Sequence, residues 1–286
     1  LPPAYYYHTT TIVRNTAKIL GKDEDAIDYA ALMDKIRDAY AKEYITPNGR
    51  MSSNTQTAYV VALSFGLIPP SLEAVAAERL AADVNNFGHI TTGFLGASDI
   101  CHVLTKYGYL DEAYHLLYRT DYPSWLYPVT QGATTIWERW DGQKPDGTFQ
   151  NPGMNSFNHY AYGAVGDWLY RKVAGMDIDP AAPGFKSIII KPHPGGEMNN
   201  VSASHDSPYG KVSSAWEIKD GKFRLTVNVP VNTTASVYVP TTGGTVLLSD
   251  KGIEGIEPQA AEGVAYSYVE VKVGSGEYTF TSPYKP

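Results

Sequence analysis

A carboxylate between two indole rings is the first feature of this sequence that suggests chemistry. Glu138 lies between Trp137 and Trp140 in the segment 132–142. Cleavage of a glycosidic bond uses a pair of carboxylates around a sugar ring, and aromatic side chains stack on the faces of such rings. Glu138 fits one member of that pair. The alternative is a surface ion pair between Glu138 and Arg139 beside two core tryptophans, and the local sequence leaves both interpretations open.

A second polar and aromatic segment, 155–163, lies at the start of a predicted helix. A helix that begins at the rim of a pocket would present Asn158 and His159 to a ligand. An imidazole donates hydrogen bonds to hydroxyl groups and alters the proton affinity of a nearby carboxylate. A structural role is the commoner one for a lone histidine, and that alternative stays open. The segment 89–96 is a loop with two glycines, which either lines the pocket wall or makes a tight turn between helices.

The remaining candidate groups are less suited to chemistry. Asp141 and Asp146 are rival carboxylates, but each precedes a glycine, a pattern typical of turns. Cys101 is the single cysteine, which excludes a disulfide within the chain and a cysteine-based metal site. No partner at metal-ligand spacing accompanies three of the histidines, His115, His193 and His205. We therefore expect no metal site and no cofactor.

Composition argues against two classes of partner. The 286 residues carry a formal net charge of −7 and no dense cluster of Lys and Arg, so no nucleic-acid partner is expected. The longest apolar runs fall short of the roughly 20 residues that cross a bilayer, so no membrane partner is expected either. The chain starts at Leu1 rather than at a methionine, and we expect its natural N-terminus upstream. One cysteine leaves the compartment open.

The N-terminal part of the chain has the periodicity of helices joined by short loops. Apolar residues recur at helical spacing, and Gly or Pro follows most of the runs. Ser71 is the predicted N-cap of the fourth helix. About seven helices in hairpins would form half of a six-hairpin (α/α)6 toroid. The predicted helices are 9–20, 23–44, 56–67, 72–84, 97–106, 111–118 and 157–173.

The pattern changes from helices to strands near the run 180–184, which is rich in proline and alanine. Beyond it, β-branched residues alternate with polar ones, and turn signals separate the runs. We expect residues 1–182 to form the partial toroid and residues 183–286 an antiparallel β-sandwich. The predicted strands are 187–190, 211–216, 223–229 and 235–239.

Several long motifs closely resemble the bacterial α-L-rhamnosidases of glycoside hydrolase family 78. They occur in the order of that family and extend over nearly the whole chain, including the β-domain phrase 231–235. The motifs in the helical part are 91–96, 122–127, 132–142 and 154–170.

The resemblance implies an (α/α)6 barrel followed by a β-sandwich, and removal of terminal α-L-rhamnosyl groups from glycosides or polysaccharides with inversion. It implies that Glu138 is the general base and that His159 contacts the sugar. We expect Trp137 and Trp140 to shape the pocket around the rhamnose ring and its methyl group, and Asn158 to lie beside it.

One part of the family pattern has no counterpart in this sequence. The general acid belongs to an Asp-rich segment in the first half of the barrel, upstream of anything here. The resemblance therefore covers the second half of the barrel, and it implies the N-terminal half of the same barrel as a partner and an inactive chain without it. Two alternatives stay open, another (α/α)6 glycosidase and a non-catalytic carbohydrate-binding fragment.

Overall fold

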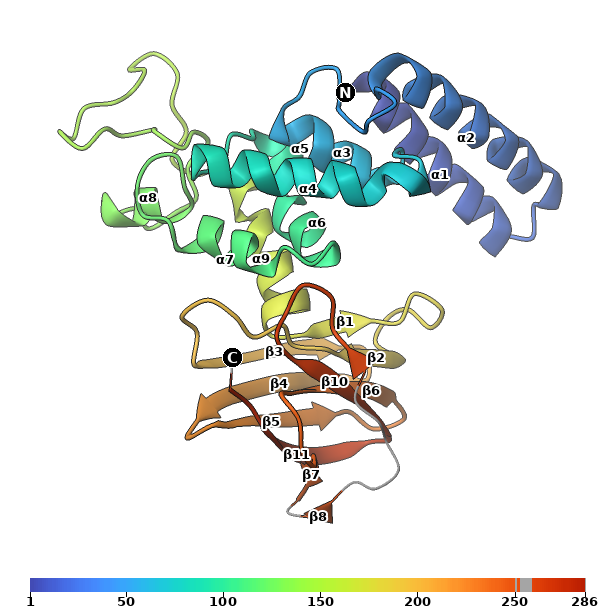
Figure 1. Cartoon of the computed structure of the whole chain (residues 1–286), viewed down its shortest axis with the longest axis vertical. Helices are drawn as coiled ribbons and strands as arrows, with labels where there is room; N and C mark the ends of the chain where they lie inside the picture. The colour runs from blue at the N-terminus through green and yellow to red at the C-terminus, as the bar shows by residue number, and fades with distance from the viewer. Residues whose placement is uncertain (250, 253–258, 286) are drawn as a thin grey trace. The chain divides into compact units, whose positions relative to one another are not determined.

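A computed structural model describes residues 1–249, 251–252 and 259–285 of the chain. The chain forms two compact units, Leu1–Ala164 and Val165–Pro286. The first is helical and the second is mainly β-sheet (Figure 1). The boundary between these units, at Ala164 and Val165, lies before the change of sequence pattern near residue 182. The division of the chain into domains at residue 182 stays a prediction.

Helical hairpins build the first unit (Figure 1). Helices α1 and α2, α3 and α4, and α6 and α7 pack as neighbouring pairs, and α3 also contacts both α1 and α6. The helices are α1 (Pro2–Ile19), α2 (Asp23–Tyr44), α3 (Gln56–Phe65), α4 (Pro70–Phe87), α5 (Phe94–Ala97), α6 (Ile100–Lys106), α7 (Leu110–Tyr118), α8 (Leu126–Thr130) and the 3₁₀-helix η1 (Tyr160–Ala164).

Local chemistry explains where the central helix α3 begins and ends. The Thr55 hydroxyl accepts a hydrogen bond from the Ala58 amide at 3.3 Å, which satisfies one of the free donors at the helix start. Gly66 ends the helix with a φ of 73°, a left-handed conformation that glycine adopts without strain. The run from Tyr59 to Leu63 is fully buried, so α3 is part of the core.

Several predicted helix bounds differ from the structure. Helix α1 begins at Pro2 rather than at residue 9, because proline at the first position has no amide hydrogen to satisfy and already has a helical φ. Helix α4 begins at Pro70 for the same reason, so Ser71 lies inside it and is not its N-cap. The predicted helix 97–106 is interrupted, and α5 and α6 flank the break at Ser98 and Asp99.

The second unit starts with the short helix α9 (Val165–Trp168) and the π-helix η2 (Leu169–Val173). Two sheets follow, with strand orders β1-β2-β6-β10-β9 and β3-β4-β5-β11-β7-β8. The strands are β1 (Met176–Ile178), β2 (Ser187–Ile190), β3 (Asn200–Ser207), β4 (Gly210–Lys219), β5 (Lys222–Val229), β6 (Thr234–Thr241), β7 (Leu247–Leu248), β8 (Lys251–Gly252), β9 (Gln259–Ala260), β10 (Ser267–Val273) and β11 (Gly276–Pro283).

The two sheets pack on each other, since β5 and β11 of one sheet both contact β6 of the other. Among the strands that the structure describes, β2 and β6 pair in parallel and the other pairs are antiparallel. Trp216 of β4 is buried and donates its indole N–H to the Val173 carbonyl at 2.8 Å. Ser214 donates to the Ala174 carbonyl at 2.7 Å, so the end of η2 is anchored to the sandwich. No helix in the described part of the chain is both long and apolar enough to cross a membrane.

Candidate functional site

Two extended segments carry the residues that the sequence singles out. The Glu138 amide donates to the Ser156 carbonyl, and the His159 amide donates to the Ile136 carbonyl, both at 2.9 Å. The Thr135 hydroxyl adds a third bond, to the Phe157 carbonyl. These bonds fix the segment 135–138 against 156–159, so the two segments that carry Glu138 and His159 lie side by side although they are distant in sequence.

The same bonds explain why the predicted helix 157–173 was wrong at its start. The backbone at 156–159 is engaged with 135–138 and is not helical, and the helical region begins only at Tyr160. That region changes from 3₁₀ to α to π geometry along its length. Asn158 and His159 therefore precede the helix, with Asn158 exposed and His159 half-buried.

Trp137 and Glu138 differ in burial although they are adjacent. The Trp137 ring is 5 % exposed and meets the Phe157 ring edge-on, with 5.1 Å between ring centroids. Gly142 lies against both rings, since a Cβ there would be only 3.2 Å from Trp137 and 3.1 Å from Phe157. Glu138 is half-buried. Trp137 is thus packed into the protein, whereas the adjacent Glu138 keeps part of its surface exposed.

Trp140 belongs to an aromatic cluster that connects three loops. Its ring stacks on Tyr162 with 3.6 Å between centroids, and Trp125 meets it edge-on at 5.6 Å. Its indole N–H donates to the Thr92 carbonyl at 3.1 Å, and the Trp125 indole donates to the Tyr162 carbonyl at 2.9 Å. The cluster therefore holds the segments 89–96, 125–142 and 159–162 together.

His159 is positioned by an aromatic partner from α5. Its ring stacks on Phe94 with 4.8 Å between centroids and an interplanar angle of 10°. Its Nδ1 accepts a hydrogen bond from the Ala161 amide at 3.4 Å, so the other ring nitrogen, Nε2, carries the proton of the neutral imidazole. Phe94 is 39 % exposed beside it. The segment 89–96 thus supplies a wall of the site.

The charged groups near Glu138 are arranged in pairs. Arg139 Nε lies 3.7 Å from Asp141 Oδ1, so among the described residues its ion pair is with Asp141. Asp146 accepts from the Thr148 amide and hydroxyl, and the hydroxyl bond is the main reason that the pKa of Asp146 is lowered. The prediction that Asp146 is a turn residue is confirmed.

The charges of these groups affect the pKa of the Tyr162 phenol. Burial raises the pKa of Tyr162 to about 12, and the negative charges of Asp141 and Glu138 add to the effect while Arg139 opposes it. The phenol therefore stays protonated at any physiological pH and is available as a hydrogen-bond donor.

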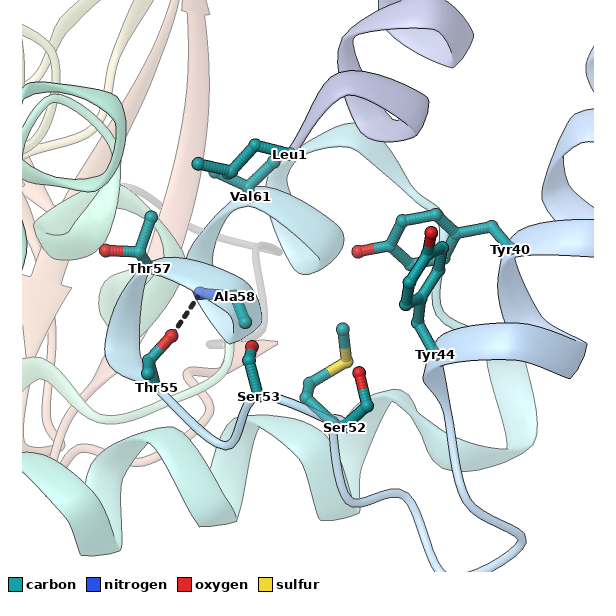
Figure 2. Close-up of a pocket in the computed structure, with 10 residues that line it drawn as sticks. Leu1, Tyr40, Tyr44, Ser52, Ser53, Thr55, Thr57, Ala58 and Val61 are labelled. Carbon is teal, nitrogen blue, oxygen red and sulfur yellow. Dashed lines mark hydrogen bonds between the residues drawn. The ribbon is translucent and has the colours of Figure 1, made fainter.

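Cavities lie in several places in the described part of the helical unit. One of about 40 Å³ lies among Trp125, Trp137, Trp140 and Tyr162, which leaves room for about one water molecule. One of about 520 Å³ is lined by the segments 120–131 and 141–145. A third, of about 400 Å³, lies among Tyr40, Tyr44 and the start of α3, and Figure 2 shows the hydroxyl groups of Ser52, Ser53, Thr55 and Thr57 around it.

Comparison with known proteins identifies the family of the chain. Residues 2–173 match the family model of the bacterial α-L-rhamnosidase six-hairpin glycosidase domain, and residues 175–254 match that of the bacterial α-L-rhamnosidase C-terminal domain. The chain belongs to the bacterial α-L-rhamnosidase family. The prediction of part of a six-hairpin toroid followed by a β-domain is thereby confirmed.

Curated relatives are α-L-rhamnosidases, which are glycoside hydrolases. The chain is 42 % identical to that of Streptomyces avermitilis over 97 % of its own length, and 40 % identical to one of Formosa agariphila over 83 %. The solved structure of the Streptomyces avermitilis α-L-rhamnosidase complexed with L-rhamnose superposes with a TM-score of 0.88 at 41 % identity over 98 % of this chain. The Aspergillus terreus α-L-rhamnosidase gives a TM-score of 0.84 at 36 % identity over 98 % of this chain. The chain spans 26 % to 30 % of these proteins.

Two further contributors to the site were not singled out in the sequence. Gln56 of α3 is fully buried, donates to the His89 carbonyl at 3.1 Å and accepts from the Thr91 amide at 2.7 Å. It fixes the loop whose Thr92 carbonyl binds Trp140. Phe94 was part of a candidate loop, but its stacking on His159 depends on a fold contact that no local pattern indicates.

Proposed function

We propose that this chain supplies one half of the active site of an inverting α-L-rhamnosidase, which removes terminal α-L-rhamnosyl residues from glycosides or polysaccharides. The observation that carries the proposal is the set of backbone hydrogen bonds between 135–138 and 156–159, which holds the segments of Glu138 and His159 side by side in a chain of this family. The named activity of the relatives supports rhamnose as the sugar.

In the proposed mechanism, the Glu138 carboxylate takes a proton from the water that attacks the anomeric carbon. A second carboxyl group, about 6.5–9.5 Å away, protonates the glycosidic oxygen from the opposite face of the sugar. We assign this general acid to the N-terminal half of the barrel.

The four other residues have positioning and binding roles in this proposal. His159 donates from Nε2 to a sugar hydroxyl, while its stacking on Phe94 fixes the ring plane. Asn158, exposed next to it, offers its amide to the same ligand. Trp140 forms the aromatic wall, and Trp137 supports the base from beneath.

The partner in this proposal is the N-terminal half of the same barrel. Large apolar side chains remain exposed along α1 and at the start of α2, and they form a surface that water covers poorly. Such a surface fits the face that the adjoining hairpins would cover. The side chains with their exposed fractions are Tyr6 54 %, Ile12 51 %, Val13 42 %, Ile19 85 %, Leu20 66 % and Ile27 68 %.

Product analysis tests the proposed reaction. The full-length parent polypeptide is given an aryl α-L-rhamnoside, and the anomer released first is identified by NMR. Inversion requires β-L-rhamnose as the first product, and the 286-residue chain alone should release none. Initial release of the α-anomer would overturn the mechanism. Turnover of other aryl glycosides in place of the rhamnoside would overturn the substrate, and sugar binding without turnover would identify a carbohydrate-binding protein.

A further inference from the structure

The pocket of about 520 Å³ that is lined by Asp141, three residues after Glu138, has no role in the mechanism above. Its lining combines one exposed aromatic ring with hydrogen-bonding side chains, and it includes Tyr122, Tyr127, Gln131, Asp141 and Lys144. Tyr122 is 51 % exposed, so a face of its ring is open to a ligand. Exposed rings beside polar groups are how proteins bind sugars.

The base of this pocket is rigidly built. Tyr127 is buried, donates its hydroxyl hydrogen to the Gln143 carbonyl at 2.8 Å, and meets the Tyr122 ring edge-on at 5.9 Å. The buried Ser124 hydroxyl accepts from the Tyr127 amide at 3.0 Å. These bonds fix Tyr127, the residue against which the Tyr122 ring packs, and a ring that is partly positioned before binding lowers the entropy cost of binding.

The pocket borders the proposed reaction site. Asp141, in its wall, pairs with Arg139, the residue after Glu138. A ligand that occupies the pocket would extend from the sugar held near Glu138 toward Tyr122.

We propose that this pocket binds the sugar ring to which the rhamnosyl group is attached, with the ring face against Tyr122 and its hydroxyls bound by Gln131, Asp141 and Lys144. The proposal rests on the proposed function. Its carboxylates already have cationic partners, Asp141 with Arg139 and Asp121 with Arg119, each at 3.7 Å. The balanced charge favours a neutral sugar over an anionic one.

Two substrates that differ only in the leaving group test the proposal in the full-length parent polypeptide. α-L-Rhamnosyl fluoride fills no aglycone pocket, whereas an α-1,6-linked rhamnosyl-glucose does. Tyr122→Ala should lower the ratio of kcat/KM for the disaccharide to kcat/KM for the fluoride by about tenfold or more. Tyr122→Phe keeps the ring and should change the ratio by less than about threefold. Tyr209→Ala, which removes another exposed tyrosine far along the sequence, should leave the ratio as it is.

Each outcome separates this proposal from the proposed function. If the parent hydrolyses the fluoride but the ratio is unchanged in Tyr122→Ala, the aglycone pocket is wrong and the rhamnosidase assignment stands. If the parent does not hydrolyse the fluoride, both proposals fall.

Lys144→Met removes an exposed polar group whose loss should not affect folding. The same ratio should fall several-fold in that variant, and an unchanged ratio would likewise count against the pocket.

Discussion

The peptide backbones of Glu138 and His159 are held by hydrogen bonds to the facing segment, and the His159 ring is positioned in addition by stacking on Phe94. The bonds from the Glu138 and His159 amides fix the two peptide segments, and the side chains remain available for a ligand. A general base needs carboxylate oxygens that can accept a hydrogen bond from water. If protein donors bound all of these oxygens, the base would bind water poorly. Arg139, whose ion pair is with Asp141, contributes to the charge balance around the base.

His159→Phe separates the two contributions of the histidine. The phenyl ring keeps the stacking contact with Phe94, so folding should be nearly unaffected, but the Nε2 donor is lost. We expect kcat/KM for an aryl rhamnoside to fall by about 10- to 100-fold, because one or two hydrogen bonds between uncharged groups of the enzyme and the sugar would be lost. Steady-state kinetics of the full-length parent provides the measurement, and full activity of the variant would show that His159 is structural.

At the scale of elements, Gln56 links the helical core to the site. Its amide bridges the His89 carbonyl and the Thr91 amide, and the next carbonyl, that of Thr92, binds the Trp140 indole. Burial raises the pKa of the neighbouring Asp83, and a hydrogen bond from Gln56 partly offsets this rise. The start of α3 thus determines where the loop before α5 lies.

Gln56→Leu should destabilise the fold markedly. Leucine has a similar volume but leaves the Thr91 amide and the His89 carbonyl without their partner, and each buried polar group so orphaned costs about 1–3 kcal/mol. We expect urea denaturation to show a loss of about 2–4 kcal/mol. The exposed Gln259→Leu is the matched control and should shift stability by less than about 0.5 kcal/mol. Equal effects of the two variants would refute the bridging role.

Elements dominated by local pattern were predicted best from the sequence. The bounds of α2 and β2 are confirmed, because amphipathic periodicity and β-branched runs determined them without help from the rest of the fold. The strand β3 was not predicted, since its outward residues are polar throughout and its inward ones small. The start of the helix 157–173 was wrong because bonds to the segment 135–138 override its helical pattern.

The candidate site was predictable only in part for the same reason. Glu138 and Trp140 were found in a conspicuous motif. Gln56 lies 33 and 35 residues from its two partners, and no local pattern links them. Phe94 likewise acquires its position beside His159 only through the fold. Side-chain contacts between distant segments are the part of a site that a single sequence does not encode visibly.

At the scale of the whole molecule, a chain with two compact units should respond to pH in each unit separately. The β-unit holds a histidine with an unusual pKa, near the start of its first sheet. Burial, followed by the positive charges of Lys172 and Lys191, lowers the pKa of His193 to about 4. Its backbone amide is bound to the Lys172 carbonyl at 2.8 Å.

His193 should make the β-unit sensitive to acid. Between the unfolded pKa of about 6.5 and the folded value of about 4, the unfolded chain binds a proton that the folded unit does not. Stability is therefore complete above pH 6.5 and is lost as the pH falls through this window. From pH 7.5 to 4.5 the wild type should lose about 2 kcal/mol more than His193→Gln, which does not titrate. Hydrogen exchange of β4 and β5 in urea measures this, and equal losses would contradict it.

The kinetic effect of Glu138→Gln tests the account most directly. Glutamine keeps the shape of the side chain but cannot accept a proton from water, so kcat of the full-length parent on an aryl α-L-rhamnoside should fall by at least about two decades. Glu78→Gln, at an exposed position on α4, is the matched control and should keep full activity. A Glu138→Gln enzyme as active as the wild type would show that this carboxylate is structural and that the proposed base is wrong.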